Sequence, residues 1–532
     1  MLEKLYLMKY IHKIILLLLS ALSVTSCEFL DSTTKGVETE EAYFSTAEEC
    51  DKYVIGVYYR NTCHVWYATY AWWVMSDMCT DDMWVGNTSQ PAKHIDWVPI
   101  AHFQGTSSAS NNTYLDSFWE SRYRSIFMAN TAIYRIADAP IDEDLKNRLI
   151  AECKFLRGYF YFDLVKNFGG VPLVLRTLAP NELHDVERSS AEQIYKQIKD
   201  DLKDAAKVLP YKKDMDYESG RANRGMAEAL LAKVHLYCEE WPEAYDAAKR
   251  VIDYGGYALE KDFMNVWSQK DNSPEAIFEI QTSSNPTYTL GCSLPVITGC
   301  RDDKGWSWGQ PTSHLENAFI AAGDEIRRRA SIIVNGETPY GTTGVGAYTI
   351  SPTMHKSGRI IRKFFLEPSQ RPLNYQHNRC KLNYHILRYA DVLLMASEAA
   401  YQLKDEDSAR DYLNEVRERV KLDDVESSGE ALYEAIKLER RLELAFEANR
   451  LYDLRRWKDA SGASDLSKLM GPNGTFVKYN TKESTDPYET TNQIESSSKG
   501  SSYMIGRDEL FPLPYAEIQL SGGKIKQNPN FN

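Results

Sequence analysis

Beyond residue 27 the sequence contains no apolar run that approaches the ~20 residues needed to cross a bilayer. It also lacks a basic stripe, since 62 lysines and arginines stand against 75 aspartates and glutamates, a net charge of −13 at pH 7. Nucleic acids and anionic lipid surfaces both select lysine and arginine, so the composition argues against either as a partner. We expect the chain beyond residue 27 to lie outside the membrane core.

Sequence motifs of common metal sites are also missing. The chain has no C-x-x-C pair, no Cys/His cluster with zinc spacing and no EF-hand loop. A glycosidase needs two carboxylates beside its substrate, and no isolated acid pair occurs in an aromatic setting. We therefore predict a protein that is not an enzyme and that carries no cofactor. A surface glycosidase is the less favoured alternative.

Three acids in the segment SDMCTDDMW form the one group that could suggest a metal site. Asp77, Asp81 and Asp82 could contribute to a calcium site, which takes roughly six to eight oxygen ligands. They could equally cap a helix or pair with arginine. Calcium therefore remains a weak alternative, and no metal is predicted.

Cysteines are few, and their spacing does not identify a disulfide framework. Eight of the nine follow Cys27. An exported protein can form disulfides, and Cys292 with Cys300 could close a local loop. Cys153 and Cys238 lie among apolar helical residues, which favours core packing.

The first 27 residues differ from the rest of the chain. Three lysines precede an apolar run at residues 14–22, and small residues then lead to Cys27. A positive start, a short apolar run and a small-residue exit are typical of a secretory signal peptide. The sequence VTSC resembles the bacterial lipobox, which implies that residues 1–26 are removed and that Cys27 receives lipid. An ordinary signal peptide with an accidental cysteine is the less favoured alternative.

Apolar residues recur with helical spacing over most of the chain. The predicted helices cover residues 48–60, 151–170, 190–210, 223–240, 241–259, 387–403, 407–420 and 430–457. The pairs within 223–259 and 387–420 resemble tetratricopeptide hairpins, in which small residues let two short helices pack closely. Such pairs need several neighbours to bury a stable core. The sequence therefore predicts a mostly helical fold with little strand.

Long irregular insertions at about residues 61–119, 283–380 and 470–502 interrupt the helices. The first two are rich in aromatic residues. A tryptophan or tyrosine ring can cover the C–H face of a sugar while neighbouring polar side chains bind its hydroxyl groups. We expect Trp72 and Trp73 to lie in the core. The candidate binding residues are Trp84, Trp97, Trp306 and Trp308, expected at the surface beside polar neighbours such as Asn87 and Gln310, with Trp66, Tyr67, Tyr288 and Asn87 as further candidates.

Four motifs, in this order, resemble the SusD/RagB family of nutrient-binding outer-membrane lipoproteins of Bacteroidetes. They are KFLRGYFYFDLVKNFGGVPLV (154–174), YHILRYADVLLMASEAAYQL (384–403), LERRLELAFEANRLYDLRRW (438–457) and ELFPLPYAEIQLSGGKIKQNPNF (509–531). The resemblance implies one SusD-like domain at residues 27–532, with tetratricopeptide-like helices that carry the binding loops.

The charged residues of the third motif are spaced for ion pairs at i,i+3 and i,i+4. They are Glu439, Arg440, Glu443, Glu447, Arg450, Asp453, Arg455 and Arg456. Since charged residues are rarely buried without partners, we predict a structural ion network rather than a catalytic site. We also expect the C-terminal segment to dock onto the body of the protein.

The resemblance implies a surface-exposed outer-membrane lipoprotein that binds an oligosaccharide or polysaccharide and delivers it to a partner TonB-dependent transporter. Glu28 and Asp31, just behind Cys27, loosely resemble a surface-export signal and favour an outward-facing body. Some relatives bind peptides, so a peptide-binding nutrient lipoprotein is the main alternative. The abundance of tryptophan in the insertions favours sugar.

Overall fold

The computed structural model of the chain describes residues 43–59, 73–86, 97–105, 111–179, 181–217, 220–351, 355, 357–479 and 499–531. The predicted signal peptide, the lipidation site Cys27 and the candidates Trp66, Tyr67 and Asn87 lie outside these residues. Within the described ranges, no helix combines the length and the apolar character needed to cross a membrane.

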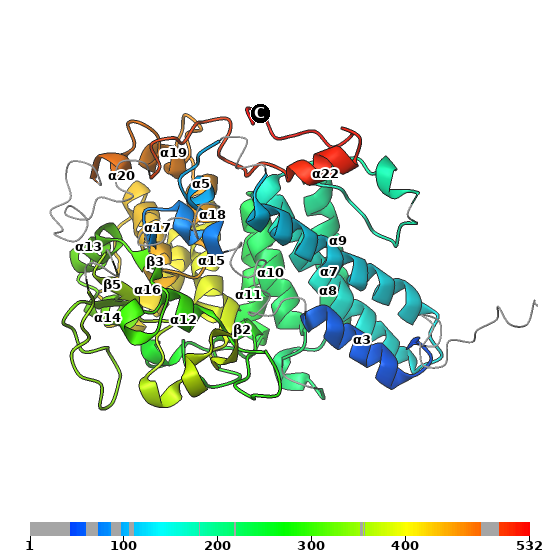
Figure 1. Cartoon of the computed structure of the whole chain (residues 1–532), viewed down its shortest axis with the longest axis horizontal. Coiled ribbons are helices and arrows are strands. Elements are labelled where there is room, and N and C mark those ends of the chain that lie inside the picture. Colours follow the sequence, from blue (N-terminus) through cyan, green and yellow to red (C-terminus); the bar gives the residue numbers. More distant parts are fainter. Residues whose placement is uncertain are drawn as a thin grey trace, which may run out of the picture.

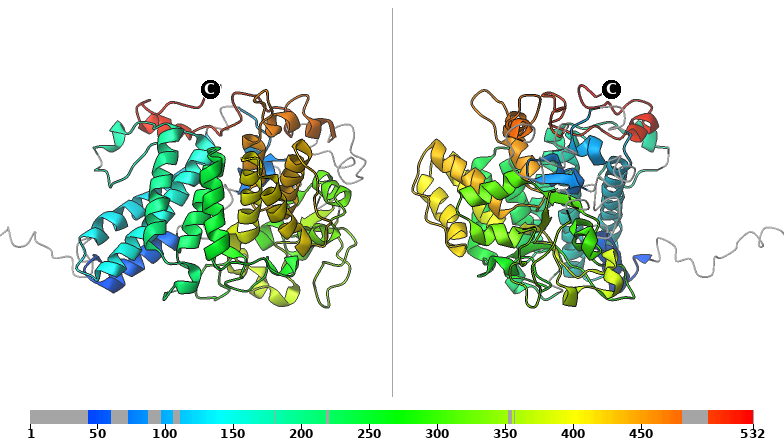
Figure 2. Two further views of the ribbon diagram at one scale, coloured as in Figure 1. Left: turned by 180° about the vertical axis from the view of Figure 1, so that it is seen from behind. Right: turned by 60° about the vertical axis from the view of Figure 1, so that its left-hand side comes forward.

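A row of helices forms one side of the molecule (Figures 1 and 2). It comprises α3 (Ala47–Tyr59), α7 (Thr113–Ala137), α8 (Glu143–Phe168), α9 (Ala191–Val208), α10 (Arg224–Tyr237), α11 (Trp241–Tyr254), α15 (Tyr389–Gln402), α16 (Glu406–Arg419) and α17 (Glu430–Glu443). From α7 to α11 each helix packs against the next, and α11 continues the row through α15 to α16. The predicted mostly helical fold is confirmed.

Local sequence signals set the ends of these helices. The Ser190 hydroxyl accepts a hydrogen bond from the Gln193 amide, and the Gln193 side chain accepts one from the Ser190 amide, so a capping box begins α9. Gly169 ends α8 with a φ of 72°, a conformation that glycine adopts easily. Ala229 and Ala244 are buried in α10 and α11, where small side chains permit close helix packing. No helix was predicted over α7, whose first residues, 113–119, were assigned to the insertion at 61–119.

The other side of the molecule is less regular and contains three two-stranded antiparallel sheets in its described part. β1 (Met83–Gly86) pairs with β3 (Trp308–Pro311), β2 (Ala276–Ile280) with β6 (Tyr384–Arg388), and β4 (Ile332–Val334) with β5 (Arg359–Ile361). The short helices are α5 (Trp97–Ala101), α12 (Leu294–Thr298), α13 (Ser313–Ala321), α14 (Glu325–Ser331), α18 (Arg450–Arg456), α19 (Asp465–Leu469), α20 (Thr475–Lys478) and α22 (Tyr515–Leu520). The prediction of little strand holds for these residues.

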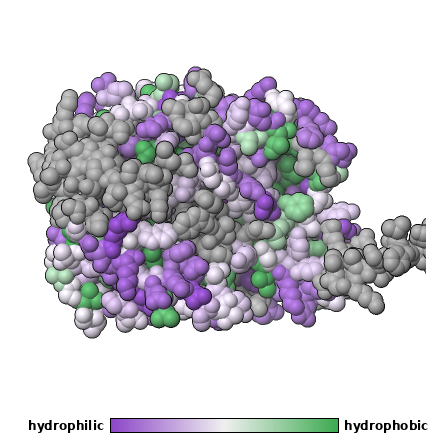
Figure 3. All heavy atoms as spheres, viewed as in Figure 1, coloured by the Kyte–Doolittle hydropathy of each residue, from purple (hydrophilic) through white to green (hydrophobic). Residues whose placement is uncertain are grey.

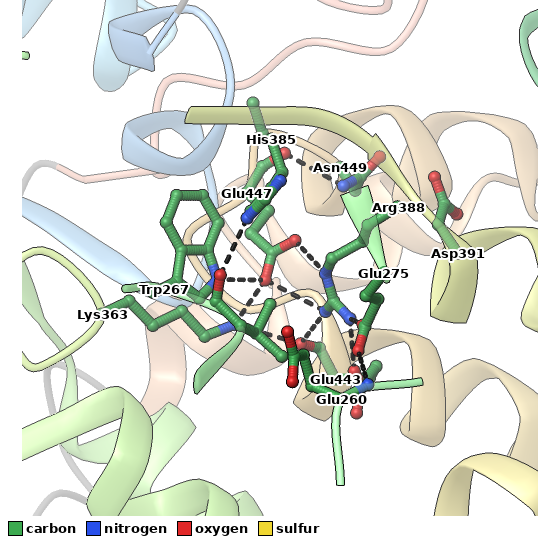
Figure 4. Close-up of polar contacts among 12 residues, drawn as sticks. Glu260, Trp267, Glu275, Lys363, His385, Arg388, Asp391, Glu443, Glu447 and Asn449 are labelled. Atoms are coloured by element: carbon green, nitrogen blue, oxygen red, sulfur yellow. Dashed lines mark hydrogen bonds and ion pairs between the residues drawn. The ribbon is translucent and has the colours of Figure 1, made fainter. Parts of the chain in front are cut away.

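A buried ion network joins the two sides (Figure 4). Arg388, at the end of β6, lies 2.6 Å from oxygens of Glu275 and Glu443 and 2.7 Å from Glu447. The Lys363 ammonium lies 2.6 Å from Glu447. Removing one member of such a buried set leaves the charge of its partners uncompensated, which typically lowers stability by about 3–5 kcal/mol. The acids of this network therefore have a structural role.

Most charged residues of the segment 438–457 belong to this network or extend it, as predicted, but most of their partners lie outside the segment rather than at i,i+3 or i,i+4. Those with ion pairs are Glu439, Arg440, Glu443, Glu447, Arg450, Asp453 and Arg456. Arg455 differs, because its guanidinium donates to the Asp508 carbonyl and lies over the Phe511 ring, 4.7 Å from its centroid. Its role is to hold the C-terminal segment.

The C-terminal segment crosses the top of the molecule in Figure 1 and ends against the helices, as expected. The Asn528 amide donates to the carbonyls of Phe168 (3.1 Å) and Phe511 (2.7 Å). The seven cysteines in the described residues are free thiols. The loop closure by Cys292 and Cys300 is therefore not formed. Cys153 is buried, as predicted, whereas Cys238 is only half-buried.

Candidate functional site

Two aromatic-rich regions that are far apart in the sequence meet at the β1–β3 ladder. Trp84 lies opposite Gln310, and Gly86 lies opposite Trp308. Directly paired residues of an antiparallel ladder present their side chains on the same face. The fold therefore brings the insertions at 61–119 and 283–380 into one structure.

A row of rings leads from this ladder towards the surface. The Trp97 ring lies 5.3 Å from Tyr114 and 4.4 Å from Trp308, centroid to centroid. The Trp308 ring lies 5.2 Å from Trp306, and the Trp306 ring lies 5.2 Å from His377. Most of these contacts are edge-to-face, an arrangement that aromatic quadrupoles favour. Only the outer end of the row, Trp306 with His377, is partly exposed.

The prediction that Trp84, Trp97 and Trp308 lie at the surface is wrong. Their side chains are 7, 0 and 7% exposed. The Trp84 ring packs 5.7 Å from Phe476, and the Lys499 ammonium lies 5.4 Å from its centroid. Polar sequence neighbours misled the prediction, because the β1–β3 ladder turns Trp84 and Trp308 inward, and Trp97, on α5, packs against the Trp308 ring. The expectation that Trp73 is a core residue is confirmed, at 0% exposed.

The turn whose His377 ring contacts Trp306 also carries polar side chains. The His377 imidazole lies 3.2 Å from the Ser293 hydroxyl, and Asn374 and Gln376 are exposed on the same turn. Burial lowers the pKa of His377, so its ring is neutral at pH 7 and can both donate and accept. His377 and Asn374 were not among the predicted site residues, because their segment carries no aromatic cluster to mark it.

Backbone strain also concentrates around Trp306. Four non-glycine residues adopt a left-handed conformation there, with φ between 50° and 63°: Lys304, Ser307, Asn374 and Tyr375. The conformation is unfavourable for a bulky residue such as tyrosine. Strained residues of this kind cluster at ligand sites, where the surrounding structure holds them in place.

Several contacts hold the strained turns. The Tyr375 hydroxyl donates to the Pro295 carbonyl (3.1 Å), and the Trp306 amide donates to Val296 (2.8 Å). Arg371 binds both oxygens of Asp303, at 2.6 and 2.5 Å. The Asp303 carboxylate therefore has a structural role, as the ion-pair partner of Arg371, and is not available as an acid or base.

Tyr288 is the most exposed of the sequence candidates that the structure describes, at 56%. It lies on the segment between β2 and α12. The end of that segment is fixed to the His377 turn, because the Gly291 amide donates to the Asn378 carbonyl at 2.9 Å. We define the Trp306 surface as Tyr288, Trp306, His377, Asn374 and Gln376. It offers aromatic faces and amides on a braced support.

The three aspartates of the weak calcium alternative are buried, and two of them, Asp81 and Asp82, lie against arginines. Burial alone would raise the pKa of Asp81, but Arg441 and Arg450 hold it well below its ordinary value. Asp82 lies 2.7 Å from Arg441. Asp77 accepts from the Ala448 amide (2.8 Å), and burial raises its pKa to about 8. The interpretation as arginine partners therefore holds for Asp81 and Asp82.

Two family models match the chain. Residues 28–236 match a family described as "Starch-binding associating with outer membrane", and residues 274–531 match the SusD family. Among curated proteins, SusD-like protein P2 of Formosa agariphila is 25% identical, over 96% of this chain and 98% of its own.

Solved structures show the same fold. A laminarin-binding SusD-like protein has a TM-score of 0.71 and 25% identity, over 92% of this chain and 100% of its own. A SusD-like protein of Bacteroides fragilis has a TM-score of 0.73 and 25% identity, over 92% of this chain and 98% of its own. The likeness covers both the helical row and the irregular side.

Proposed function

This chain belongs to the SusD family, and on that premise we propose that it binds an oligosaccharide or polysaccharide at the Trp306 surface without cleaving it. The observation that carries the proposal is a partly exposed tryptophan ring in a strained, polar turn. A structural relative that binds laminarin, at 25% identity, supports a glycan as the ligand class.

The Trp306 surface suits a sugar chain that lies across aromatic rings. The faces of Trp306 and Tyr288 can cover sugar C–H groups, while His377 and the amides of Asn374 and Gln376 can bind hydroxyls. By analogy with bases stacked on aromatic side chains, each ring contributes on the order of 1–3 kcal/mol. Two rings then give a modest affinity, which suits a protein that must release its cargo.

Calorimetry with laminarin and a panel of other glycans tests the proposal. Trp306→Ala should weaken binding about tenfold or more, because it removes a stacking face, whereas Trp306→Phe should retain part of the affinity. Tyr254→Ala, which removes an exposed ring on α11, is the matched control and should leave binding unchanged.

Two outcomes would contradict the proposal. Glycan binding that survives both Trp306→Ala and Tyr288→Ala would place the site elsewhere. Shortened sugar chains in the product analysis would show an enzyme. A parallel titration with peptides tests the alternative ligand class. Binding of peptides without binding of any glycan would show that the ligand is a peptide.

We further propose that the protein is lipid-anchored in the outer membrane, faces the cell exterior and delivers its ligand to a TonB-dependent transporter. A protein that only binds its ligand cannot move it inward, so it needs a partner that spans the membrane. Pull-down from detergent-solubilised membranes should recover such a transporter. Repeated recovery of this protein alone would contradict the partnership.

A further inference from the structure

An apolar groove of about 620 Å³ lies on the helical side of the molecule, away from the Trp306 surface in the fold. Its floor is α7, with Tyr123, Ile126 and Phe127. One wall is formed by residues 172–178 with 184–186, and the other by the C-terminal residues 517–525. The lining is predominantly apolar, from Val174 and Leu178 in one wall to Leu520 and Ile525 in the other.

Hydrogen bonds fix both walls of the groove. The Tyr123 hydroxyl donates to the Pro172 carbonyl (2.8 Å), and the Asn130 amide donates to the Val174 carbonyl (2.9 Å). His184 Nδ1 lies 3.3 Å from the Leu520 carbonyl, which links one wall to the other. The groove is therefore preformed, and a partner would not have to pay for ordering it.

Exposed apolar side chains continue from the groove onto the surrounding surface. Phe127 is 53% exposed, Leu520 64% and Leu175 41%. Tyr134, 61% exposed, lies two turns beyond Phe127 on the same face of α7. Hydrophobic residues gather over α7 and α22 at the upper right of Figure 3. Contiguous exposed apolar surface of this kind marks an interaction site.

One end of the groove is acidic. Glu517 and Glu120 line it, and Asp116 acts on Glu517 electrostatically from the same helix as Glu120. Burial raises the pKa of Glu517, and burial raises that of Asp116 to about 6. Asp116 Oδ1 has no hydrogen-bond partner among the described residues. Arg124 neutralises Glu120 at 2.5 Å, which leaves two carboxyl groups that a cation would stabilise.

We propose that this groove docks a segment of a protein partner that carries apolar side chains and a lysine or arginine. The apolar side chains would fill the groove, and the cation would lie against Glu517 and Asp116. The acidic end disfavours an anionic lipid surface, which selects basic residues. The apolar stripe extends past the groove to Tyr134, which favours a macromolecule over a small ligand. The proposal does not depend on glycan binding.

Site-specific photo-crosslinking of the full chain in cells tests the partner. p-Benzoylphenylalanine replaces Phe127, or replaces Tyr254 on α11 as the control position of similar exposure, 55%. Position 127 should crosslink one protein at least fivefold more than position 254, through a peptide that contains a lysine or arginine among apolar residues. No enrichment, a lipid adduct, a crosslink to a second copy of this chain or an acidic peptide would each overturn the proposal.

Charge variants test the acidic end with the same crosslinker in place. Glu517→Lys should lower the crosslink yield at least tenfold, and Glu517→Gln should lower it severalfold. Glu243→Lys, at an exposed position of α11, is the matched control and should leave the yield unchanged. Melting temperature and laminarin binding of each variant report on folding and on the Trp306 surface. An unchanged yield in a folded Glu517→Lys variant would overturn the proposal.

Discussion

Among individual residues, Asp77 combines complete burial with a position beside other acids. Burial, with the Asp82 and Glu447 carboxylates nearby, raises its pKa to about 8, although the Ala448 amide acts in the opposite direction. In the unfolded chain an aspartate titrates near ~3.9. The folded state therefore keeps a proton on Asp77 at neutral pH, and its carboxyl group is held as the neutral acid.

This shift gives a prediction about pH. Because the folded pKa lies above the unfolded one, the contribution of Asp77 to stability is full below about pH 4 and is lost as pH rises through about 8. Asp77→Asn, which mimics the protonated form, should match the wild type near pH 4. At pH 8.5 it should be more stable by roughly 1–3 kcal/mol. This range is smaller than the full pKa shift would give at about 1.36 kcal/mol for each pKa unit.

Urea unfolding at both pH values measures the difference for Asp77→Asn. Asp82→Asn is the contrasting variant, since it removes a charge that pairs with Arg441 and should destabilise the protein at both pH values. Equal stability of Asp77→Asn and the wild type at pH 8.5 would show that Asp77 is ionised in the folded protein.

At the scale of secondary structure, the β1–β3 ladder decides which aromatic residues are available. It lies directly on the core, because Gly309 in β3 meets the Trp73 ring. Gly309 has a φ of 62°, and a Cβ there would lie 2.0 Å from that ring. Glycine is thus required twice, for its backbone conformation and for the space it leaves.

Gly309→Ala should therefore destabilise the protein by about 3 kcal/mol or more. A left-handed alanine costs roughly 1–2 kcal/mol, and forcing atoms into a packed core adds typically 1–3 kcal/mol. Gly323→Ala is the matched control, since its φ is 67° but nothing lies within 4 Å of the added Cβ. Denaturant unfolding compares the two. Similar losses for both variants would show that the contact with Trp73 relaxes at no cost.

At the scale of the whole molecule, a row of helices supports an irregular side whose turns carry the Trp306 surface. The buried network around Arg388 fixes one side to the other. Rigid support matters for a stacking site, because a ring that is held in place loses little side-chain entropy when it binds. The groove over α7 belongs to the helical side, so each side offers a surface of its own.

Attachment to the membrane is a prediction for the whole protein that rests on Cys27. Cys27→Ala should remove the lipid acceptor and release the protein into the soluble fraction. Cys238→Ala, a half-buried thiol in the helical row, is the control and should remain with the membranes. Fractionation and immunoblotting measure the distribution. A Cys27→Ala variant that stays in the outer-membrane pellet would contradict the lipid anchor.

Local signals in the sequence determined the helical side. Capping residues, the glycine after α8 and the 3.6-residue spacing of apolar positions act within one or two turns, so they can be recognised without the fold. The density of charge in residues 438–457 predicted an ion network, but not its partners, because Arg388, Arg327 and Glu398 come from segments distant in sequence. The family also followed from these segments, whose order and composition the sequence shows directly.

Only the tertiary structure decided which candidate rings face solvent. Trp84, Trp97 and Trp308 share the composition around Trp306. Strand pairing between segments far apart in the chain turned Trp84 and Trp308 inward, and Trp97 on α5 packs against the Trp308 ring. His377 and Asn374 joined the surface because their turn packs against α12, a contact that no local pattern reports. The same holds for the groove, which forms where the C-terminal segment meets α7. Burial at such places depends on partners distant in sequence. The sequence alone therefore predicts which segments are rich in aromatic residues, but not which of their rings are exposed to solvent.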